Sequence, residues 1–231
     1  MNIAGWITDT VRESYDRLAD EYARRLFCEL DKKPFDRLLL DRFAHATTLR
    51  GKVCDVGCGP GEVADYLAKA GARVVGLDLS PQMLEHARHL NPDLSFIEGN
   101  MMSLPFKTAE LAGIAAFYAI VNVPPEYLSR VFEEMHRVLQ LDGLLLLAFH
   151  VGNGRVSDPE SWTWGRRISM DWFLFPTAEV RRLLEAAGFR IEDVIERDPY
   201  PPEVEDQTRR AYIFARRRRT EEGSCRCPAD R

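Results

Sequence analysis

The stretch VCDVGCGPG at residues 53–61, followed by VVGLDLS at residues 74–80, decides the fold of this chain. The first stretch is an apolar strand that runs into a turn with three glycines. The second is another apolar strand, and it ends in a carboxylate. A strand, a glycine-rich turn, a short helix and a second strand closed by an acid form half of a nucleotide-binding unit.

Asp55 indicates which kind of nucleotide this unit binds. It lies two residues before the first glycine of the turn, inside the end of the strand. A dinucleotide places its pyrophosphate over this turn, and a fixed carboxylate there would repel it. The same carboxylate would attract a ligand that has a cationic amino group and no phosphate. S-adenosylmethionine is such a ligand, with its adenosine near Asp78 and its methionine ammonium near Asp55.

Both stretches resemble motifs of the class I (Rossmann-like) S-adenosylmethionine-dependent methyltransferases, within their small-molecule type. In that family a VxDxGxGxG segment is the loop at the methionine end of the cofactor, and the acid that closes the second strand holds the ribose hydroxyls. The resemblance extends from about Tyr15 to about Ala215. It implies an α/β fold: a single Rossmann-like domain whose seven-stranded, mostly parallel sheet has helices on both faces and an antiparallel C-terminal hairpin.

Apolar periodicity and turn residues predict helices that alternate with strands. Because of this alternation the sheet should be mostly parallel, and the last two strands, with no helix between them, should form an antiparallel hairpin. Ser80 and Thr177 are the expected N-caps of their helices. We expect helices at residues 8–30, 34–46, 61–70, 81–90, 125–139 and 177–187, and strands at residues 52–56, 73–78, 94–98, 111–118, 144–150, 189–197 and 210–216.

The length of 231 residues suits one domain with additions at its ends. Residues 1–50 should form N-terminal helices that cover the cofactor site, residues 51–216 the methyltransferase domain, and residues 217–231 a flexible tail. Within the domain, residues 151–176 lack a clear period, and we expect them to form a lid over the acceptor.

The charge distribution disfavours a nucleic-acid partner. The chain has a net charge of −5, and its last sixteen residues, with six arginines and three acids, carry +3, so the body carries −8. Binding along nucleic acid needs a basic face. The arginine run at residues 216–219 is interpreted as a solvated tail, because no aromatic residues interleave with it.

Two further absences in the sequence concern membranes and export. No run of eighteen apolar residues is present, so no membrane partner is expected. The acids and the arginine near the N-terminus leave no apolar region of the kind that a secretory signal has.

The five cysteines predict neither a disulfide framework nor a metal site. Cys54 and Cys58 lie in the glycine turn without a partner cluster at metal-ligand spacing, so we interpret them as small packing residues and expect no metal. The pattern suits a reducing cytoplasm. A monomer or a homodimer is equally compatible with the sequence.

The resemblance assigns the two strand ends and the turn to the cofactor. A carboxylate at Asp78 accepts hydrogen bonds from both ribose hydroxyls, and its alternative role as a helix cap already belongs to Ser80. Asp55 faces the methionine amino group, through water. The turn lets the backbone approach the ligand without a Cβ in the way, at Gly57, Gly59 and Gly61.

Other segments complete the expected cofactor site. Leu79 and Met83 flank the adenine in one interpretation and pack in the core in the other. Most family members have an acid at the position of Asn100 that accepts from the adenine amino group, so the asparagine is a departure whose carbonyl still accepts. The Met101 amide would donate to an adenine ring nitrogen.

Aromatic residues from two segments are also candidates. In the family the first helix closes over the cofactor with tyrosines, and Tyr15 and Tyr22 lie seven residues apart on one helical face. The alternative for both is ordinary amphipathic packing. In the family, the segment that leaves the fourth strand lies beside the reactive methyl group. It contains one cofactor candidate, Phe117, and two substrate candidates, Tyr118 and Asn122. Many members have a histidine where Asn122 stands, which weakens any role for Asn122 as a general base.

His150 ends the fifth strand at the ligand edge and is the best-placed histidine for a general base. A structural role at the strand end remains the alternative. Methyl transfer is an in-line displacement at an already activated sulfonium, so placement of the reactants supplies most of the rate. A base matters only if the acceptor must lose a proton.

The segment 151–176 is the candidate wall of the acceptor site. Its tryptophans and arginines would make an apolar pocket with a cationic rim, and a packed insertion without a ligand is the alternative. The substrate candidates in it are Trp162, Trp164 and Trp172, with Arg155, Arg166 and Arg167 at the rim.

The sequence therefore predicts a cytoplasmic methyltransferase that uses S-adenosylmethionine, releases S-adenosylhomocysteine and methylates a small organic acceptor. One alternative is an NAD-dependent oxidoreductase, but that class predicts GxGxxG where this chain has GxGxG with Asp55 before it. A second is a non-catalytic module that binds S-adenosylmethionine. A third, an RNA or protein acceptor, is disfavoured by the acidic body.

Overall fold

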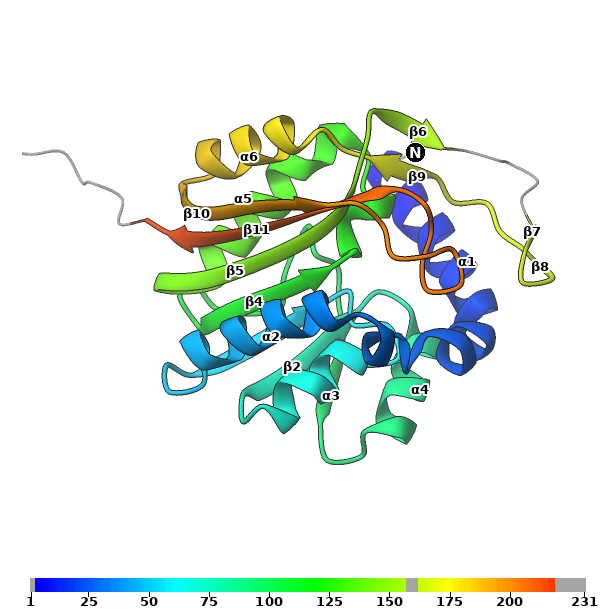
Figure 1. Ribbon diagram of the computed structural model, residues 1–231, viewed down its shortest axis with the longest axis horizontal. Coiled ribbons are helices and arrows are strands. Elements are labelled where there is room, and N and C mark those ends of the chain that lie inside the picture. The colour runs from blue at the N-terminus through cyan, green and yellow to red at the C-terminus, as the bar shows by residue number, and fades with distance from the viewer. Residues whose placement is uncertain (1–2, 157–161, 219–231) are drawn as a thin grey trace, which may run out of the picture.

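A computed structural model describes residues 3–156 and 162–218 of the chain. Seven strands form one sheet in the order β10-β11-β5-β4-β1-β2-β3 (Figure 1). The five strands from β5 to β3 pair in parallel, and β10 and β11 pair antiparallel, which confirms the predicted fold class and hairpin. The strands are β1 Lys52–Val56, β2 Arg73–Asp78, β3 Ser95–Glu98, β4 Leu111–Phe117, β5 Leu139–Val151, β10 Phe189–Arg197 and β11 Arg209–Arg217.

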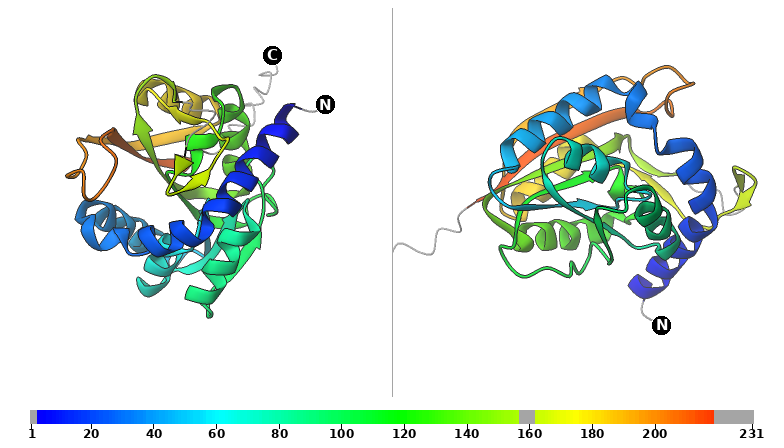
Figure 2. Two further views of the ribbon diagram at one scale, coloured as in Figure 1. Left: turned by 90° about the vertical axis from the view of Figure 1, so that its right-hand side faces the viewer. Right: turned by 90° about the horizontal axis from the view of Figure 1, so that it is seen from below.

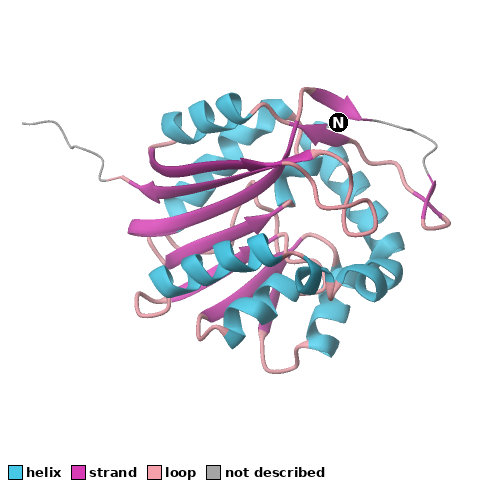
Figure 3. Cartoon of the chain, viewed as in Figure 1, coloured by secondary structure: helices cyan, strands magenta, loops and turns pink. Residues whose placement is uncertain are grey.

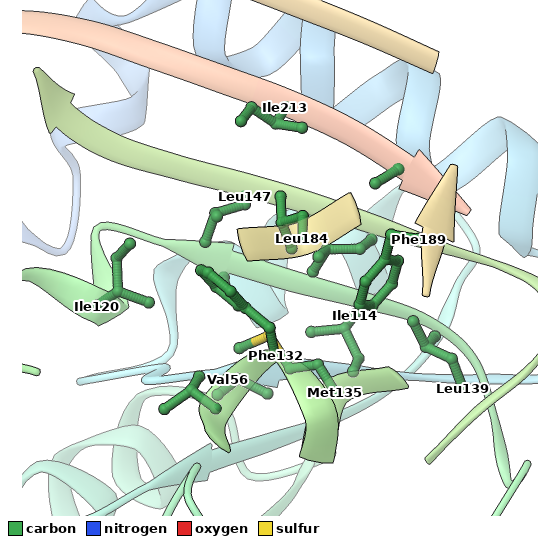
Figure 4. Packing of buried hydrophobic residues seen from close by; sticks show 14 of the residues in the cluster. Val56, Ile114, Ile120, Phe132, Met135, Leu139, Leu147, Leu184, Phe189 and Ile213 are labelled. Carbon is green, nitrogen blue, oxygen red and sulfur yellow. The ribbon is translucent and has the colours of Figure 1, made fainter. Parts of the chain in front are cut away.

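Helices cover both faces of this sheet (Figure 3). One face carries α2 Pro34–Thr47, α3 Glu62–Lys69 and α4 Pro81–Leu90. The other carries α5 Leu128–Val138 and α6 Thr177–Ala186. On this second face Phe132 and Met135 of α5 pack with Leu184 of α6 against the strands, and all three are fully buried (Figure 4). Apolar burial on both faces drives the formation of these layers.

Helix α1, Ile3–Leu26, lies across the carboxyl ends of the central strands, as the left view of Figure 2 shows. Asp16 ties it to the start of α4, because its carboxylate accepts a hydrogen bond from the Ser80 hydroxyl at 2.6 Å and from the Gln82 amide at 3.3 Å. The Ser80 hydroxyl in turn accepts from the Met83 amide at 3.1 Å, so Ser80 is the predicted N-cap. The first helix is thus fixed over the edge of the sheet where ligands bind in open α/β folds.

The first helix ends four residues earlier than the sequence predicts. The prediction of residues 8–30 was wrong there, because α1 ends at Leu26 and a 3₁₀ turn, η1, follows at Glu29–Lys32. Pro34 disfavours helical backbone at the residue before it, and Lys33 has φ −117° and ψ 70°.

Two other local predictions were wrong. Thr177 lies inside α6 rather than capping it: Pro176 is at the N-cap position without a side-chain cap, and the buried Thr177 hydroxyl has no hydrogen-bond partner among the described residues. The fifth strand starts at Leu139 instead of residue 144, since its first residues pair with β4 before an irregularity in the register.

The predicted lid segment forms two small antiparallel pairs next to α1. Strand β6, Gly154–Val156, pairs with β9, Trp172–Leu174, and β7, Trp162–Thr163, pairs with β8, Arg166–Arg167. Ile168 and Met170 of this segment are buried against Leu18 of α1. The expected tail, residues 217–231, falls outside the described residues from position 219 on. Within the described ranges, the helices are too short or too polar to span a bilayer.

Candidate active site

The glycine turn after β1 has the conformation that the sequence predicts. Gly57 has φ +73°, and its amide and that of Cys58 donate to the Leu77 carbonyl at 2.7 and 3.0 Å. A Cβ at Gly57 would approach the Ala119 Cβ to 2.6 Å. Both the left-handed backbone and the close approach therefore require glycine here. Gly59 and Gly61 also have positive φ, and Gly61 is the N-cap of α3.

Asp78 at the end of β2 closes the turn on its other side. One carboxylate oxygen accepts from the Gly59 amide at 2.9 Å, and the other accepts from the Ser80 amide at 2.9 Å. Burial raises the pKa of Asp78, while the backbone donors Ser80 and Gly59 oppose that shift. A carboxylate has about four acceptor positions, so the backbone contacts from Ser80, Gly59 and Leu79 leave acceptor capacity for a ribose hydroxyl.

A first cavity opens above this turn. Twelve of the predicted site residues line it, from helix α1, the turn, and the segments after β2, β3 and β4. They are Tyr15, Tyr22, Gly57, Gly59, Asp78, Leu79, Met83, Asn100, Met101, Phe117, Tyr118 and Asn122.

At one end of the first cavity, apolar side chains meet a polar loop. Leu79, Met83 and Met101 are among the apolar residues that line this cavity. The Asn100 carbonyl oxygen accepts from the Met102 amide at 2.8 Å, and its amide group donates to Thr8 of α1 at 3.3 Å. Asn100 thus shapes the loop itself. Apolar faces beside a few fixed polar groups suit an adenine ring.

A third, smaller cavity continues from the first toward α3, and Asp55 lies in its wall. The Asp55 side chain is 1% exposed, and its Oδ2 atom has no hydrogen-bond partner among the described residues. Burial raises the pKa of Asp55 to about 8, although a backbone hydrogen bond with Ala64 opposes the shift. A cationic donor next to this oxygen would supply the missing hydrogen bond. Its charge would also favour the ionised form of Asp55.

A second cavity of about 650 Å³ lies between α1 and the lid segment. It shares Val11, Asn122 and Pro124 with the first cavity. The Tyr15 hydroxyl donates to the Asn122 carbonyl oxygen at 2.7 Å, and the Asn122 amide donates to the Asp171 carbonyl at 2.7 Å. Asn122 therefore joins α1, the segment after β4 and the lid at the point where the two cavities meet.

Comparison with known proteins identifies the family that has this arrangement. A family profile described as methyltransferase domain matches residues 53–143, which include the glycine turn and Asp78. An uncharacterized methyltransferase of Synechocystis is 30% identical over 148 residues, covering 61% of this chain and 67% of that protein. The chain belongs to the class I S-adenosylmethionine-dependent methyltransferases.

Two further similarities agree with this assignment. A 2-phytyl-1,4-naphthoquinone methyltransferase of Nostoc is 28% identical over 161 residues, covering 64% of this chain and 69% of that protein. A solved S-adenosylmethionine-dependent methyltransferase of Methanosarcina mazei aligns with a TM-score of 0.64 at 20% identity, covering 72% of this chain and 92% of that one. At that identity the structural likeness concerns the fold.

The residues present in this methyltransferase fit S-adenosylmethionine. Asp78 keeps acceptor capacity for a ribose hydroxyl, and the orphaned Asp55 oxygen fits an ammonium group. Gly57 lines the first and third cavities, and a Cβ there would collide with Ala119. Within the described ranges, no His, Cys, Asp and Glu side chains gather in the numbers that a metal ion requires.

Trp164 and Trp172 of the lid pack on α1 in this methyltransferase. Trp164 lies edge-on to Tyr22, with ring centroids 5.9 Å apart, and beneath the Arg25 guanidinium at 5.5 Å. Trp172 packs beside Leu18 and Met170. Neither tryptophan is among the residues described in the walls of the three cavities. The Trp162 side chain lies outside the described residues, so the predicted tryptophan wall stays a prediction.

His150 lies behind the cavities, next to Tyr118. The two ring centroids are 5.1 Å apart, and the His150 Nδ1 atom is 2.7 Å from the Thr208 hydroxyl. Burial lowers the pKa of His150 to about 3, and Arg210 and Lys33 lower it further. A neutral imidazole with so low a pKa is a weak base, and no described cavity wall includes it. Its role as a general base stays a prediction.

Three acidic residues of the site were not identified from the sequence. Glu29, Asp36 and Glu62 line the third cavity with Asp55. Glu62 directly follows the last turn glycine, a position that could have suggested it. Glu29 lies in η1 and Asp36 in the first turn of α2, and no motif marks them, because they reach the site only through the packing of these elements on the sheet.

Proposed function

We propose that this methyltransferase transfers a methyl group from S-adenosylmethionine to a small organic acceptor. The supporting observation is the pair of adjoining cavities that meet at Asn122. The first has the groups that a nucleoside and a methionine need, and the second is of the size that encloses a small molecule. A donor and an acceptor held in adjoining cavities meet at the shared wall.

The cofactor would supply a methyl group already activated on a sulfonium sulfur. The residues of the chain would then bind and orient. Asp78 would hold the ribose hydroxyls, Asp55 the ammonium, and the loop at Asn100 and Met101 the adenine. Helix α1, fixed through Asp16, would exclude water. Burial, with Asp78 nearby, raises the pKa of Tyr15, so its hydroxyl stays protonated and keeps its hydrogen bond to Asn122. Placement of the two reactants is then the main source of rate.

The walls of the second cavity indicate an amphipathic acceptor. Its buried wall includes Met170 and Phe173, at 3% and 9% exposure, whereas Arg17 and Arg155 at its rim are more than half exposed. An acceptor with an apolar body and a polar or charged end would match both. Methylation of a quinone by the Nostoc relative is compatible with this class of acceptor.

The remaining proposals concern the setting of the reaction. We place it in the cytoplasm, where Cys28, Cys54 and Cys58, which are free thiols in the structure, would stay reduced. Residues 1–50 would act as the cover of the cofactor site and residues 151–176 as the acceptor lid. A monomer or a homodimer would serve this reaction equally.

Replacing Ser169 with tryptophan is expected to block the acceptor cavity. Ser169 is exposed and lines the second cavity without lining the first. A bulky ring there should lower turnover by about tenfold or more, while the dissociation constant for S-adenosylmethionine changes by less than about twofold, on the order of 0.4 kcal/mol. Release of S-adenosylhomocysteine, screened against a panel of small acceptors, measures turnover, and calorimetry measures cofactor affinity.

Ser129→Trp is the matched control, because Ser129 is exposed on α5 away from the described cavity walls. It should leave both quantities unchanged. Equal turnover in Ser169→Trp and the wild type would show that the second cavity does not hold the acceptor. Cofactor binding without turnover of any acceptor would favour a non-catalytic binding module instead.

A further inference from the structure

Acidic side chains dominate the wall of the third cavity. Of the described residues that line it, none is a lysine, an arginine or a histidine. Its volume is about 30 Å³, and a cavity needs about 10–15 Å³ to hold one water molecule, so one or two groups of that size fit. Size and charge together suit a small cationic group. The four acids in the wall are Glu29, Asp36, Asp55 and Glu62.

Two of these four carboxylates are already compensated by the protein. Glu29 pairs with Lys33 at 3.0 Å. Asp36 belongs to a buried network, in which Arg197 donates to one of its oxygens at 3.1 Å and the Tyr212 hydroxyl donates to the other at 3.0 Å. Neither Glu29 nor Asp36 therefore needs a charge from a ligand.

The other two carboxylates are incomplete. The Oδ2 atom of Asp55 and the Oε2 atom of Glu62 are both buried and have no hydrogen-bond partner among the described residues. Asp55 lies at the end of β1, and Glu62 is the first residue of α3. Burial raises the pKa of Glu62 well above its usual value, and the nearby charges of Glu29 and Asp55 add to that shift. A cation beside these two oxygens would favour the ionised form of both groups.

The glycine turn next to these acids has no amide left for an anion. Between residues 57 and 61, each amide donates to a backbone carbonyl or to Asp78, and Pro60 has no amide hydrogen. At the start of α3, the amides of Glu62 and Ala64 donate to the Glu62 and Asp55 carboxylates. A ligand carboxylate in this cavity would thus meet two unpaired carboxylate oxygens and no free amide of the turn. A ligand amine would meet two acceptors.

We propose that Glu62 joins Asp55 in holding the terminal amine of the cofactor, and that the third cavity selects a sulfonium nucleoside whose chain ends in a primary amine without a carboxylate beside it. This inference rests on the proposed function, in which the nucleoside occupies the first cavity. A primary ammonium has three N–H donors, enough for both unpaired oxygens.

Decarboxylated S-adenosylmethionine, whose chain ends in an aminopropyl group, belongs to this class of ligand. S-adenosylmethionine itself binds through the same amine, but its carboxylate carries the same charge as Asp55 and Glu62 and is repelled by them. The carboxylate of S-adenosylmethionine therefore lowers the affinity of this site instead of adding to it.

The test is the ratio of the dissociation constants for S-adenosylmethionine and for its decarboxylated analogue, measured by calorimetry on the intact chain. We expect the wild type to bind the analogue at least as tightly as S-adenosylmethionine, and up to about tenfold more tightly. Glu62→Gln keeps the size of the side chain and removes its charge. It should weaken binding of the analogue by about five- to tenfold. It should weaken S-adenosylmethionine by less than about threefold, because the lost attraction to the amine is offset by lost repulsion of the carboxylate.

Glu85→Gln is the matched control, because Glu85 is exposed on α4 and lies outside the described walls of the three cavities. It should leave both dissociation constants unchanged. The unfolding midpoint of Glu62→Gln should equal or exceed that of the wild type, because the substitution removes a carboxylate that lacks a partner. Weaker binding in that variant then reflects the lost charge and not a damaged fold.

Two results would overturn the proposal. One is binding of the decarboxylated analogue to the wild type more than about threefold weaker than that of S-adenosylmethionine, since the carboxylate would then contribute to affinity. The other is a ratio of dissociation constants in Glu62→Gln equal to that of the wild type. Failure of the wild type to bind either compound would instead contradict the proposed function.

Discussion

Replacing Asp78 with alanine is expected to weaken S-adenosylmethionine binding by about ten- to a hundredfold, which corresponds to roughly 1.5–3 kcal/mol. The carboxylate would lose charge-assisted hydrogen bonds to the ribose hydroxyls. The substitution would also remove the hydrogen bonds that the Gly59 and Ser80 amides donate to Asp78, both at 2.9 Å. The glycine turn would lose its support, so part of the loss would come from a disordered binding loop. Calorimetry with the purified variant measures the effect.

The two backbone contacts of Asp78 also support the fold, and we expect the free energy of unfolding to fall by about 1–2 kcal/mol. Asp78→Asn separates the two effects, because its carbonyl oxygen still accepts one backbone hydrogen bond without carrying charge. Asp93→Ala, at an exposed acid after α4, is the control. An Asp78→Ala variant with wild-type affinity would show that Asp78 does not hold the cofactor.

Replacing Arg197 with methionine is expected to destabilise the fold by about 3–5 kcal/mol, because it removes the ion-pair partner of the buried Asp36 carboxylate. Glu205 would lose one of its cationic partners and keep Lys33 and Arg210, at 3.7 and 3.6 Å. The Asp36 and Glu205 side chains are 0% and 2% exposed. Burial alone would raise the pKa of Glu205, but the hydrogen bond from Arg197 holds that pKa below its usual value. For a domain of this size the midpoint of thermal unfolding should fall by roughly 6–20 °C.

Arg181→Met is the matched control for this substitution. Arg181 pairs with Glu185 at 3.1 Å one turn along α6, with both side chains more than 40% exposed. Such a surface pair contributes about 0.5 kcal/mol or less, so its loss should shift the unfolding midpoint by at most about 2 °C. Equal midpoints for Arg197→Met and Arg181→Met would mean that the buried network adds nothing to stability.

The central half of the fold could be predicted because its signals are local. Strands β1 and β2 have short apolar sequences next to turn residues, and both were predicted with the bounds that the structure gives. Ser80 and Pro81 mark the start of α4 in the sequence, and the cap hydrogen bond is present. Gly57 lies where only a residue without a Cβ fits. Each of these features depends on residues within a few positions of one another.

The features of the site that the sequence did not predict depend on packing between distant segments. Asp36 on α2 reaches Arg197 on β10, 161 positions away, and no local pattern links them. Trp164 is a large aromatic residue of the kind that lines pockets, but its ring packs against Tyr22 on α1. His150 was correctly placed at a strand end, while its burial behind Tyr118 depends on the β10–β11 connection that supplies Thr208. Sequence periodicity contains none of this information.

A calorimetric titration of the intact chain with S-adenosylmethionine, S-adenosylhomocysteine and NAD tests the central claim most directly. In the proposed function, Asp55 in the third cavity holds a cationic amino group and Asp78 in the first holds a ribose of the same ligand, with no pyrophosphate between them. We expect saturable binding of S-adenosylmethionine and S-adenosylhomocysteine at one site per chain, and no heat from NAD above the background of dilution. Tight binding of NAD without binding of S-adenosylmethionine would contradict the account.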